Sequence, residues 1–451
     1  MGKTYQEQYN EKLISAEKAA QIVKSGTTIH YGAFLGKPND FDTELAKRKD
    51  ELKDIFIYGA GGLLPLMQTA FCDPTHEHFT CNSWYFTIVD RKLSDNGRMF
   101  HSPIHFHQAL DMASRGIQTL DIFVAQVSPM DEHGFFSFGC TNIYSLEGAI
   151  TADLVILEVN QNMPRIPGGS EEAVHISQVD YVIEGSNAPL FELPPAASAT
   201  DADQEMARLL LEEIPDRACL QLGIGALPNT LGKLLCDSDL KDLGIHTEMF
   251  VDSMVELFDR GIVTNKYKQI DRGKIVFTFC IADKPTYDFC DRNPLLASHP
   301  CSYTNSPNVI SRNTNLISIN NIVEIDLFSQ VCAESSGFRQ ISGTGGQVDF
   351  VHGAWMSPGG KSFLCLSSTF TDKDGNLHSR IIPTLQPGSI VTTPRTSVDY
   401  IVTEFGKAQL KGQSSWRRAE LLVELAHPQF RDELVKEAAR MGIWRLTNKI
   451  E

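Results

Sequence analysis

The sequence predicts an α/β protein made of two related α/β domains in tandem, with its functional site in the cleft between them. Short apolar, β-rich runs alternate with helical or turn segments, which indicates a largely parallel sheet. The order helix, strand, glycine-rich turn occurs at residues 16–38 and again at 204–228. The proline-containing stretch 185–203 lies between them and is typical of a linker. Pockets often form between two such domains.

The first domain is expected at residues 1–190. It opens with a helix that Ser15 caps and that Gly26 ends. Runs rich in apolar and β-branched residues follow it and are separated by helical or turn segments. These runs predict strands within residues 27–34, 54–62, 119–129 and 152–160.

The second domain, residues 191–451, contains the stretch "GIHTEMFVDSMVELFDRG" at 244–261. Its first half alternates like a strand, and the segment after it fits a short helix that Asp252 or Ser253 caps and Gly261 ends. Glu248 is therefore expected near the C-terminal end of an apolar strand, just before a helix. One face of this strand would carry Ile245, Thr247, Met249 and Val251, and the other His246, Glu248 and Phe250.

Composition limits the partners of the chain. Its 451 residues carry a net charge of −16 without a run of Lys or Arg, so nucleic acid and anionic membranes would be repelled. No apolar run approaches the ~20 residues that span a bilayer, and the polar N-terminus is unlike a signal peptide. The ten cysteines form no CxxC pair and are expected to be mostly buried thiols in a reducing cytoplasm.

Two glycine-rich turns are candidates for ligand binding. "LGIGALPNTLG", residues 222–232, follows a strand and precedes a helix, so its amides can hold a phosphate or carboxylate. It lacks the G-x-G-x-x-G spacing of dinucleotide sites. "SGTGGQVDF", residues 342–350, can bind a pyrophosphate or a developing oxyanion. From spacing alone, a plain tight turn explains the first segment as well as ligand contact does. A flexible loop likewise explains the second segment as well as ligand contact does.

The remaining motifs do not indicate a nucleotide-binding, serine hydrolase or zinc site. "SPGGKS" at 357–362 resembles the end of a Walker A loop, but Trp355 occupies the position of the required glycine. No G-x-S-x-G nucleophile elbow or HExxH zinc motif is present. We therefore expect no metal, and interpret five histidines as satisfied or ligand-lining groups. These are His76, His78, His101, His105 and His107.

Three segments together resemble one family, the class I CoA-transferases of the acetyl-CoA hydrolase/transferase branch. They are "QLGIGALP" at 221–228, the stretch 244–261 that contains "HTEM", and "SGTGGQVDF" at 342–350. The likeness covers nearly the whole chain and is greatest to 4-hydroxybutyrate CoA-transferases and their butyrate-using relatives. It implies two open α/β domains of the type shared with sugar-phosphate isomerases, with the active site between them. The sequence leaves the oligomeric state open, and we expect a homodimer.

The resemblance also implies roles for single residues. Glu248 in "HTEM" matches the catalytic nucleophile, the turn at 223–227 matches a CoA-contacting loop, and the turn at 343–347 matches the loop at the CoA arm and thioester. The implied CoA-binding residues are Gly223, Ile224, Gly225, Ala226, Leu227 and Gly343, and the implied oxyanion and thioester residues are Gly345, Gly346 and Gln347. The Ser-Glu-Asn-Gly surround of two-subunit members is absent, so their acceptor preferences do not transfer.

The implied reaction moves CoA between short-chain acids such as acetate, butyrate and 4-hydroxybutyrate. Glu248 would form a glutamyl-CoA thioester in a ping-pong cycle, with acyl-CoA as substrate and without ATP or a tightly bound cofactor. A dicarboxylate such as succinate or itaconate stays open, since Lys37, Arg165 or a histidine could bind a second carboxylate. Also open are an acyl-CoA hydrolase that uses the same glutamate, and a sugar-phosphate isomerase or ligand sensor on this fold.

Overall fold

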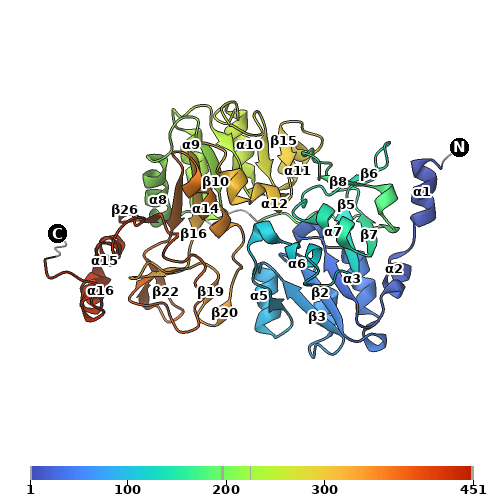
Figure 1. The fold of residues 1–451 in the computed structure, drawn as a ribbon, viewed down its shortest axis with the longest axis horizontal. Helices are drawn as coiled ribbons and strands as arrows, with labels where there is room; N and C mark the ends of the chain where they lie inside the picture. The colour runs from blue at the N-terminus through green and yellow to red at the C-terminus, as the bar shows by residue number, and fades with distance from the viewer. Residues whose placement is uncertain (1–2, 195–197, 224, 448–451) are drawn as a thin grey trace.

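The computed structural model describes residues 3–194, 198–223 and 225–447, which form two lobes, each built around a mostly parallel sheet (Figure 1). The chain starts at one end of the elongated molecule and finishes at the opposite end. This arrangement confirms the predicted α/β class with two α/β units in tandem.

The first lobe contains a seven-stranded sheet in which every neighbouring pair is parallel. The four predicted runs each contain one of its strands. In spatial order the strands are β4 (Phe100–His101), β3 (Phe79–Ser83), β2 (Ile55–Gly59), β1 (Thr28–Tyr31), β5 (Ile122–Val127), β7 (Leu154–Val159) and β9 (Tyr181–Glu184). A separate ribbon pairs β6 (Phe135–Ser137) with β8 (Ala173–His175).

Helices α2, α3 and α7 flank this sheet in the first lobe (Figure 1). The helices are α1 (Tyr5–Lys12), α2 (Ala16–Ile22), α3 (Asn39–Ala46), α4 (Gln68–Cys72), α5 (Ile88–Asp95), α6 (Asp111–Ser114) and α7 (Ser145–Thr151). The 3₁₀ turns are η1 (Phe34–Gly36), η2 (Lys49–Glu51), η3 (Phe106–Gln108) and η4 (Ile176–Gln178).

Helix α2 shows one confirmed boundary and one wrong one. Ser15 caps it as predicted, with its hydroxyl accepting from the Lys18 amide. The helix ends at Ile22 rather than running on to Gly26. The reason is tertiary: the Arg48 guanidinium donates to the carbonyls of Ala20 and Val23, and so satisfies the end of the helix early.

The second lobe is built on a six-stranded sheet with the spatial order β11, β10, β16, β21, β25, β26, parallel except for the final β25–β26 pair. In each lobe the first strand of the sheet lies inside the sheet, with the second strand on one side and a later one on the other: β1 lies between β2 and β5, and β10 lies between β11 and β16. The two sheets are thus similar near their first strands, although their full strand orders differ. The strands are β11 (Gly244–Ile245), β10 (Cys219–Leu222), β16 (Leu316–Asn321), β21 (Lys361–Cys365), β25 (Tyr400–Thr403) and β26 (Gly406–Gln409).

Short strands and helices complete the second lobe. The paired strands are β12 (Met249–Phe250) with β14 (Phe279–Cys280), β13 (Ile275–Phe277) with β15 (Leu296–Ser298), β19 (Ser335–Ser336) with β20 (Arg339–Gln340), and β22 (Thr369–Thr371) with β23 (Leu377–Ser379). A three-stranded sheet has β17 (Glu324–Asp326) between β18 (Val331–Cys332) and β24 (Ile381–Ile382). The helices are α8 (Asp201–Leu211), α9 (Ala226–Cys236), α10 (Asp252–Asp259), α11 (Lys284–Cys290), α12 (Cys301–Thr304), α13 (Pro307–Ile310), α14 (Gln347–Met356), α15 (Ser415–Leu425) and α16 (Pro428–Arg440).

The single strand expected around Glu248 is broken in two. β11 pairs with β10 in the main sheet, whereas β12 pairs with β14 outside it. The backbone changes partner because His246 bridges to Val276 and the Thr247 amide donates to the Val276 carbonyl at 3.0 Å. Both faces of the segment are packed: of residues 244–250, all are buried except Glu248, which is half-buried.

The start of α10 also differs from the prediction. The helix begins at Asp252, and Val251 is its N-cap without a side-chain hydrogen bond. The Asp252 carboxylate instead accepts from the Thr286 hydroxyl at 3.0 Å, at the start of α11. Gly261, with φ of 73°, follows the helix end as expected.

One hydrophobic core runs through both lobes. It joins residues such as Phe123 and Phe136 of the first half to Leu231 and Phe277 of the second. The expected linker is packed against this core: the Leu193 amide donates to the Ala282 carbonyl at 3.1 Å. The domain boundary at 190/191 stays a prediction that falls between β9 and α8.

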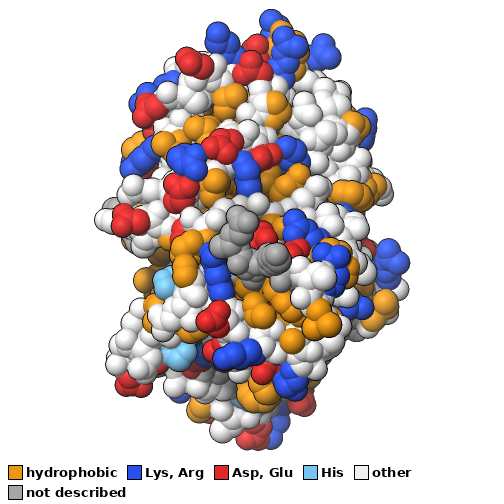
Figure 2. Space-filling model, turned by 90° about the vertical axis from the view of Figure 1, so that its left-hand side faces the viewer, with side chains coloured by type: hydrophobic (Ala, Val, Ile, Leu, Met, Phe, Trp, Pro, Cys, Tyr) orange, Lys and Arg blue, Asp and Glu red, His pale blue; other side chains and the backbone are white. Residues whose placement is uncertain are grey.

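The surface charges and the state of the cysteines are those that the composition leads us to expect. Figure 2 looks at the end of the molecule that carries the C-terminal helices, where basic and acidic side chains are intermixed. All ten cysteines are free thiols and eight are buried, as expected. Within the described ranges, the helices are too short or too polar to cross a membrane.

Candidate active site

A cavity of about 470 Å³ lies between the two lobes, where the sequence places the functional site. Its wall is largely apolar and takes residues from both lobes and from the linker between them. Among these are Phe34, Leu63, Tyr85, Phe86, Ile88 and Phe106 of the first half, Phe191, Leu193 and Pro194 of the linker, and Leu222, Met249, Phe279 and Ile281 of the second half. The described lining residues include only two charged side chains, Glu248 and Arg91.

Glu248 enters this cavity at the break between β11 and β12. Its carbonyl accepts from the Thr278 and Phe279 amides at 3.0 and 3.3 Å, which fixes the backbone on one side. The side chain is half-buried and lines the cavity. A carboxylate on such an anchored segment has little freedom to move, as a precisely placed reactive group requires.

Asn305 binds the Glu248 carboxylate. Its Nδ2 donates to Oε2 at 2.7 Å, and the asparagine is fully buried at the C-cap of α12. No motif in the sequence marks Asn305, which lies 57 residues beyond Glu248. A contact between distant segments brings the two residues together: the Thr304 carbonyl at the end of α12 lies 2.8 Å from Nε2 of His246, two residues before Glu248.

The glycine-rich turn 343–346 lies against the same carboxylate and leads directly into helix α14. Gly346 is the N-cap of that helix, and a Cβ there would overlap both the Glu248 carboxylate and the Asn305 amide. Gly345 has φ of 52°, in the left-handed region that favours glycine. The positive end of a helix dipole, with its free backbone N–H groups, therefore faces Glu248.

The other two residues predicted in this turn have different neighbours. Gly343 lines the cavity and packs against the backbone of Trp84 and Tyr85 in the first lobe. Gln347 is the first residue of α14, lines the cavity, and donates from Nε2 to the Thr393 hydroxyl at 3.0 Å. Its amide is thus oriented by the protein.

The site raises the pKa of Glu248 to about 7. Burial is the largest cause, and the negative charge of Asp349 adds to it, while hydrogen bonds from the Asn305 side chain and the Gly346 backbone act in the opposite direction. A carboxylate with a raised pKa is a stronger base and nucleophile once it is ionised.

A segment of the first lobe, η3, is bonded to the turn and to α14. The Phe106 amide donates to the Gly345 carbonyl at 3.3 Å. The His107 amide and Nδ1 lie 3.1 and 2.7 Å from the two oxygens of buried Asp349. This hydrogen bond is the main cause that raises the pKa of His107. The first lobe therefore fixes the position of the turn that faces Glu248.

The second predicted turn, 223–227, has fewer described residues at the cavity than the turn 343–347. Gly223 lines the cavity, and Gly225, with φ of 119°, is the N-cap of α9. Ala226 and Leu227 belong to α9, and Leu227 is buried in the core. Ile224 lies outside the described residues. Of this set, Gly223 alone among the described members reaches the cavity.

The histidines have structural partners. His78 Nδ1 lies 2.7 Å from the Leu52 carbonyl, His101 Nδ1 lies 3.2 Å from the Ser83 carbonyl, and the His76 ring packs on Phe100. His105 lies near Asp349 beside His107. In the part of the chain that the structure describes, no three His, Cys, Asp or Glu residues are grouped as a metal site.

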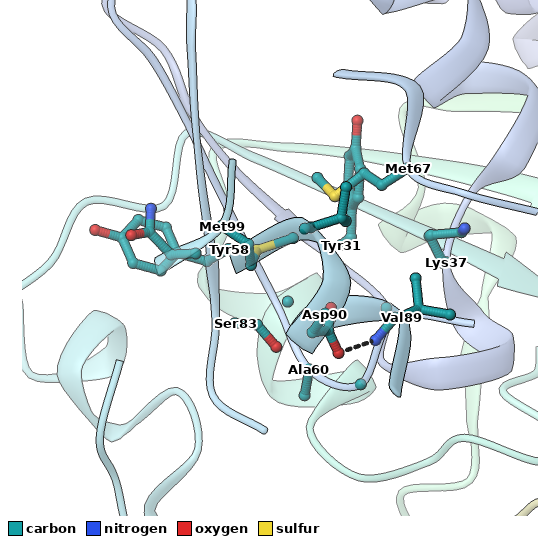
Figure 3. Close-up of a pocket in the computed structure, with 15 residues that line it drawn as sticks. Tyr31, Lys37, Tyr58, Ala60, Met67, Ser83, Val89, Asp90 and Met99 are labelled. Atoms are coloured by element: carbon teal, nitrogen blue, oxygen red, sulfur yellow. Dashed lines mark hydrogen bonds between the residues drawn. The ribbon is translucent and has the colours of Figure 1, made fainter. Parts of the chain in front are cut away.

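Neither Lys37 nor Arg165, the cations considered for a second carboxylate, lines the main cavity. Lys37 borders a second cavity of about 30 Å³, room for about one water, which Figure 3 shows with Asp90 and Tyr31. The Lys37 ammonium donates to the carbonyls of Leu63 and Pro65. Arg165 forms an ion pair with Asp131 at 3.1 Å. The cation that does line the main cavity is Arg91 of α5, which the sequence patterns did not indicate.

Comparison with known proteins agrees with this geometry. Family models of the acetyl-CoA hydrolase/transferase N-terminal and C-terminal domains match residues 2–192 and 283–438. The butyryl-CoA:acetate CoA-transferase of Anaerostipes caccae is 48% identical over 446 residues, which are 99% of this chain and 100% of that protein. The 4-hydroxybutyrate coenzyme A transferase of Clostridium kluyveri is 39% identical over 96% of this chain and 98% of its own length.

Solved structures extend the match to the fold. The crystal structure of RipA from Yersinia pestis has a TM-score of 0.87 at 38% identity, and the superposition covers 97% of this chain and 99% of RipA. The resemblance inferred from "QLGIGALP", "HTEM" and "SGTGGQ" is thereby confirmed along the chain. The protein belongs to the acetyl-CoA hydrolase/transferase family and is an enzyme of the CoA-transferase type within it.

Proposed function

We propose that the enzyme transfers CoA from an acyl-CoA to a short-chain carboxylate through a thioester formed on Glu248. The observation that carries this proposal is the position of the Glu248 carboxylate. It lines an apolar cavity, is held by Asn305 at 2.7 Å, and faces the N-terminus of α14. An anchored carboxylate with a raised pKa, beside hydrogen-bond donors, is suited to attack a carbonyl carbon.

The reaction then proceeds by exchange between carboxylates and a thiolate. A Glu248 oxygen attacks the thioester carbonyl, the carbon–sulfur bond breaks, and an acyl-glutamyl anhydride and CoA thiolate result. The thiolate attacks the glutamyl carbonyl, releases the first acid as its carboxylate, and leaves glutamyl-CoA. An acceptor carboxylate reverses these steps and departs as the new acyl-CoA. Each step conserves the single negative charge, so no external proton donor is needed.

Asn305 and the Gly346 amide are the proposed oxyanion donors. Both already point at the Glu248 carboxylate, so they can bind the oxygen that becomes negative when its carbonyl is attacked. Their positions are set by α12 and α14 before substrate arrives, so little reorganisation is required. A donor of this kind typically contributes about 3 kcal/mol to the transition state.

We propose monocarboxylates of the acetate, butyrate and 4-hydroxybutyrate type as the acids. Close to Glu248 the wall is aromatic: Phe34 stacks on Phe279 with centroids 4.6 Å apart, and Phe106 packs edge-on to Phe279. Such a wall accepts short alkyl chains. Among the described residues that line the cavity, Arg91 of α5 is the one cation, and it is not among the groups that shift the pKa of Glu248. The relatives at 48% and 39% identity, named for such acids, support this choice.

Transfer is favoured over hydrolysis by the same aromatic residues. Water must reach glutamyl-CoA for hydrolysis, and an apolar enclosure keeps water scarce around the intermediate. An acceptor acid brings its own apolar chain to that wall and competes with water. We therefore expect acyl-CoA loss to be slow without an acceptor acid and fast with one.

The test is to trap the intermediate. Incubation with butyryl-CoA, digestion and mass spectrometry should place the mass of CoA on the peptide that contains Glu248, and acetate should discharge the label. Glu248→Gln should lose both the label and about 10⁴-fold or more of transfer, as nucleophile removal does in other covalent enzymes. Initial rates over both substrates should give parallel double-reciprocal lines.

The matched control is Glu256→Gln, which removes an exposed carboxylate of α10. It should keep both label and rate. A label on a different residue, or intersecting double-reciprocal lines, would contradict the covalent mechanism on Glu248.

Three further properties are proposed with the function: a homodimer, a cytoplasmic location, and no tightly bound cofactor. The free, mostly buried thiols support a reducing compartment. Light scattering of the purified protein, and mass spectrometry under native and denaturing conditions, test the assembly and the cofactor directly.

A further inference from the structure

Arg91 has an unusual position for an arginine. It lies in the middle of α5 and lines the main cavity, and its Nε is buried without a hydrogen-bond partner. Within the described residues, no ion pair or side-chain hydrogen bond involves its guanidinium. An arginine that is partly withdrawn from water and has no partner is costly, unless a ligand supplies the acceptor.

The natural partner of Arg91 on its own helix is engaged elsewhere. Asp95 lies one turn further along α5, at a spacing that allows an ion pair. Its two oxygens instead accept from Arg339 of β20 at 2.7 and 2.6 Å. This hydrogen bond is the main cause that lowers the pKa of Asp95, with the charge of Arg91 as a smaller one. Arg339 thus connects β20 of the second lobe to α5 of the first, two elements that lie side by side (Figure 1). Arg91 is left on the cavity wall.

The place of Arg91 on the cavity wall also bears on which group it can bind. The charge of Arg91 lowers the pKa of Tyr85, which the charge of Glu248 raises, and Arg91 is not among the groups that shift the pKa of Glu248. Next to Arg91 on the same helix, Ile88 lines the cavity with 63% of its surface exposed. Arg91 therefore lies on the same helix as an exposed residue of the cavity wall, toward the side of the cavity that meets solvent.

We infer that Arg91 binds a phosphate group of the CoA arm. This inference rests on the proposed function, which brings acyl-CoA into the cavity. A thioester at Glu248 extends outward through a long pantetheine chain, and its anionic groups lie at the far end. A guanidinium binds a phosphate through paired N–H donors. The net charge of −16 repels CoA at long range, so a local cation is required to hold it.

The experiment compares two donors that differ in their phosphates. Butyryl-CoA carries all of them, and butyryl-pantetheine carries none. With acetate as acceptor, Arg91→Gln should raise the KM for butyryl-CoA about tenfold to a hundredfold, the size of a lost charge-assisted hydrogen bond. The KM and kcat for butyryl-pantetheine should stay unchanged, which also shows that the variant is folded. Arg91→Lys should restore part of the KM.

Two further arms sharpen the assignment. The ratio of the KM of Arg91→Gln to that of wild type for butyryl-CoA should fall as ionic strength rises, because salt screens the attraction between the guanidinium and a phosphate. Lys92→Gln, a neighbouring exposed position on α5, is the control and should behave like wild type. Butyryl-4′-phosphopantetheine as donor shows whether the first phosphate of the arm is the one bound.

Several outcomes overturn the inference. An equal loss with both donors would make Arg91 a structural residue, and an unchanged KM for butyryl-CoA would exclude contact with the arm. A loss confined to succinate as acceptor would assign the guanidinium to a carboxylate of the acid instead. If wild-type enzyme failed to transfer CoA from butyryl-CoA to acetate, the proposed function itself would fail. Normal wild-type transfer with an unaffected variant would refute only the role of Arg91.

Discussion

The two glycine-rich turns of the second half both precede a helix and both reach the cavity, but they use glycine for different reasons. In the turn before α9, Gly225 has φ of 119°, which only glycine adopts readily, and Gly223 has space around it. In the turn before α14, Gly346 has an ordinary φ of −90°, and no space for a side chain. Both turns contain a glycine with positive φ, Gly225 in the first and Gly345 in the second, but only the second also has a glycine, Gly346, that is needed for close approach.

This difference separates the reacting centre from its surroundings. The atoms that crowd Gly346 are the Glu248 carboxylate and the Asn305 amide, the groups that the proposed chemistry uses. The atom nearest to a Cβ on Gly223 would be the Ile319 carbonyl oxygen, at an ordinary contact distance of 3.5 Å. Similar motifs in the sequence should therefore respond very differently to the same substitution.

The largest effect is expected from Gly346→Ala. The added methyl group would displace the Glu248 carboxylate or the Asn305 amide, since the backbone itself can adopt the required φ. The kcat for CoA transfer should fall by about 10²-fold to 10³-fold, as for the loss of an oxyanion donor. Steady-state rates with butyryl-CoA and acetate measure this fall, and thermal denaturation measures any change in stability.

Gly59→Ala is the matched control. Gly59 ends β2 with 3.8 Å to its nearest neighbour, so the methyl group fits and the rate should be retained. Full turnover by Gly346→Ala would show that the turn is only a connector, and the contrast between the two turns would disappear.

A slightly smaller effect is expected from Asn305→Ala. The substitution removes one donor to the carboxylate and leaves the Gly346 amide in place, so kcat should fall about 10²-fold. Because the asparagine hydrogen bond lowers the pKa of Glu248, its loss should also move the acid limb of the pH profile to higher pH. Stopped-flow or steady-state rates across pH check both effects.

Asn308→Ala, an exposed position on α13 three residues away, should change neither quantity. If Asn305→Ala lowered only the stability and left kcat and the pH limb unchanged, its contact with Glu248 would be structural.

Much of this arrangement could be predicted from the sequence, because it rests on local patterns. Apolar runs predict the strands that lie within residues 27–34, 54–62, 119–129 and 152–160, and a turn residue predicts the helix end at Gly261. Both glycine-rich turns were found in the same way. The roles assigned to Glu248 and the turns came from the family resemblance, and they stay predictions that the geometry supports.

What could not be predicted depends on contacts between distant segments. The break in the strand before Glu248 arises from pairing with residues 276–279. Asn305 meets Glu248 only through the packing of α12, and Asp349 meets His107 across the two lobes, 242 residues apart. Arg91 is one arginine among many until α5 is placed beside the cavity. No local period or spacing contains this information.

The next effect in size is the dependence of kcat/KM on pH, about tenfold per pH unit. Attack requires the ionised form of Glu248, and its pKa is raised to about 7, chiefly by burial. The kcat/KM for acyl-CoA, which reports on the free enzyme, should therefore fall about tenfold per pH unit below pH 7 and level off above it. Asp349→Asn removes a negative charge that raises this pKa, so its limb should lie at lower pH. A limb near the usual pKa of ~4.3 for Glu would contradict this assignment.

The smallest effect is expected from Gly223→Ala, and it tests the other side of the comparison. The methyl group would enter the cavity without meeting protein atoms closer than 3.5 Å, so folding and the geometry at Glu248 should be preserved. If the CoA arm passes this turn, the methyl group would occupy part of the space of the arm both in the bound substrate and in the transition state. Such uniform interference raises KM and leaves kcat nearly unchanged. We expect a KM for butyryl-CoA raised about threefold, with kcat within about twofold of wild type. A fall in kcat as large as that of Gly346→Ala would mean that both turns contact the reacting atoms. An unchanged KM would place the CoA arm elsewhere in the cavity, closer to α5 than to α9.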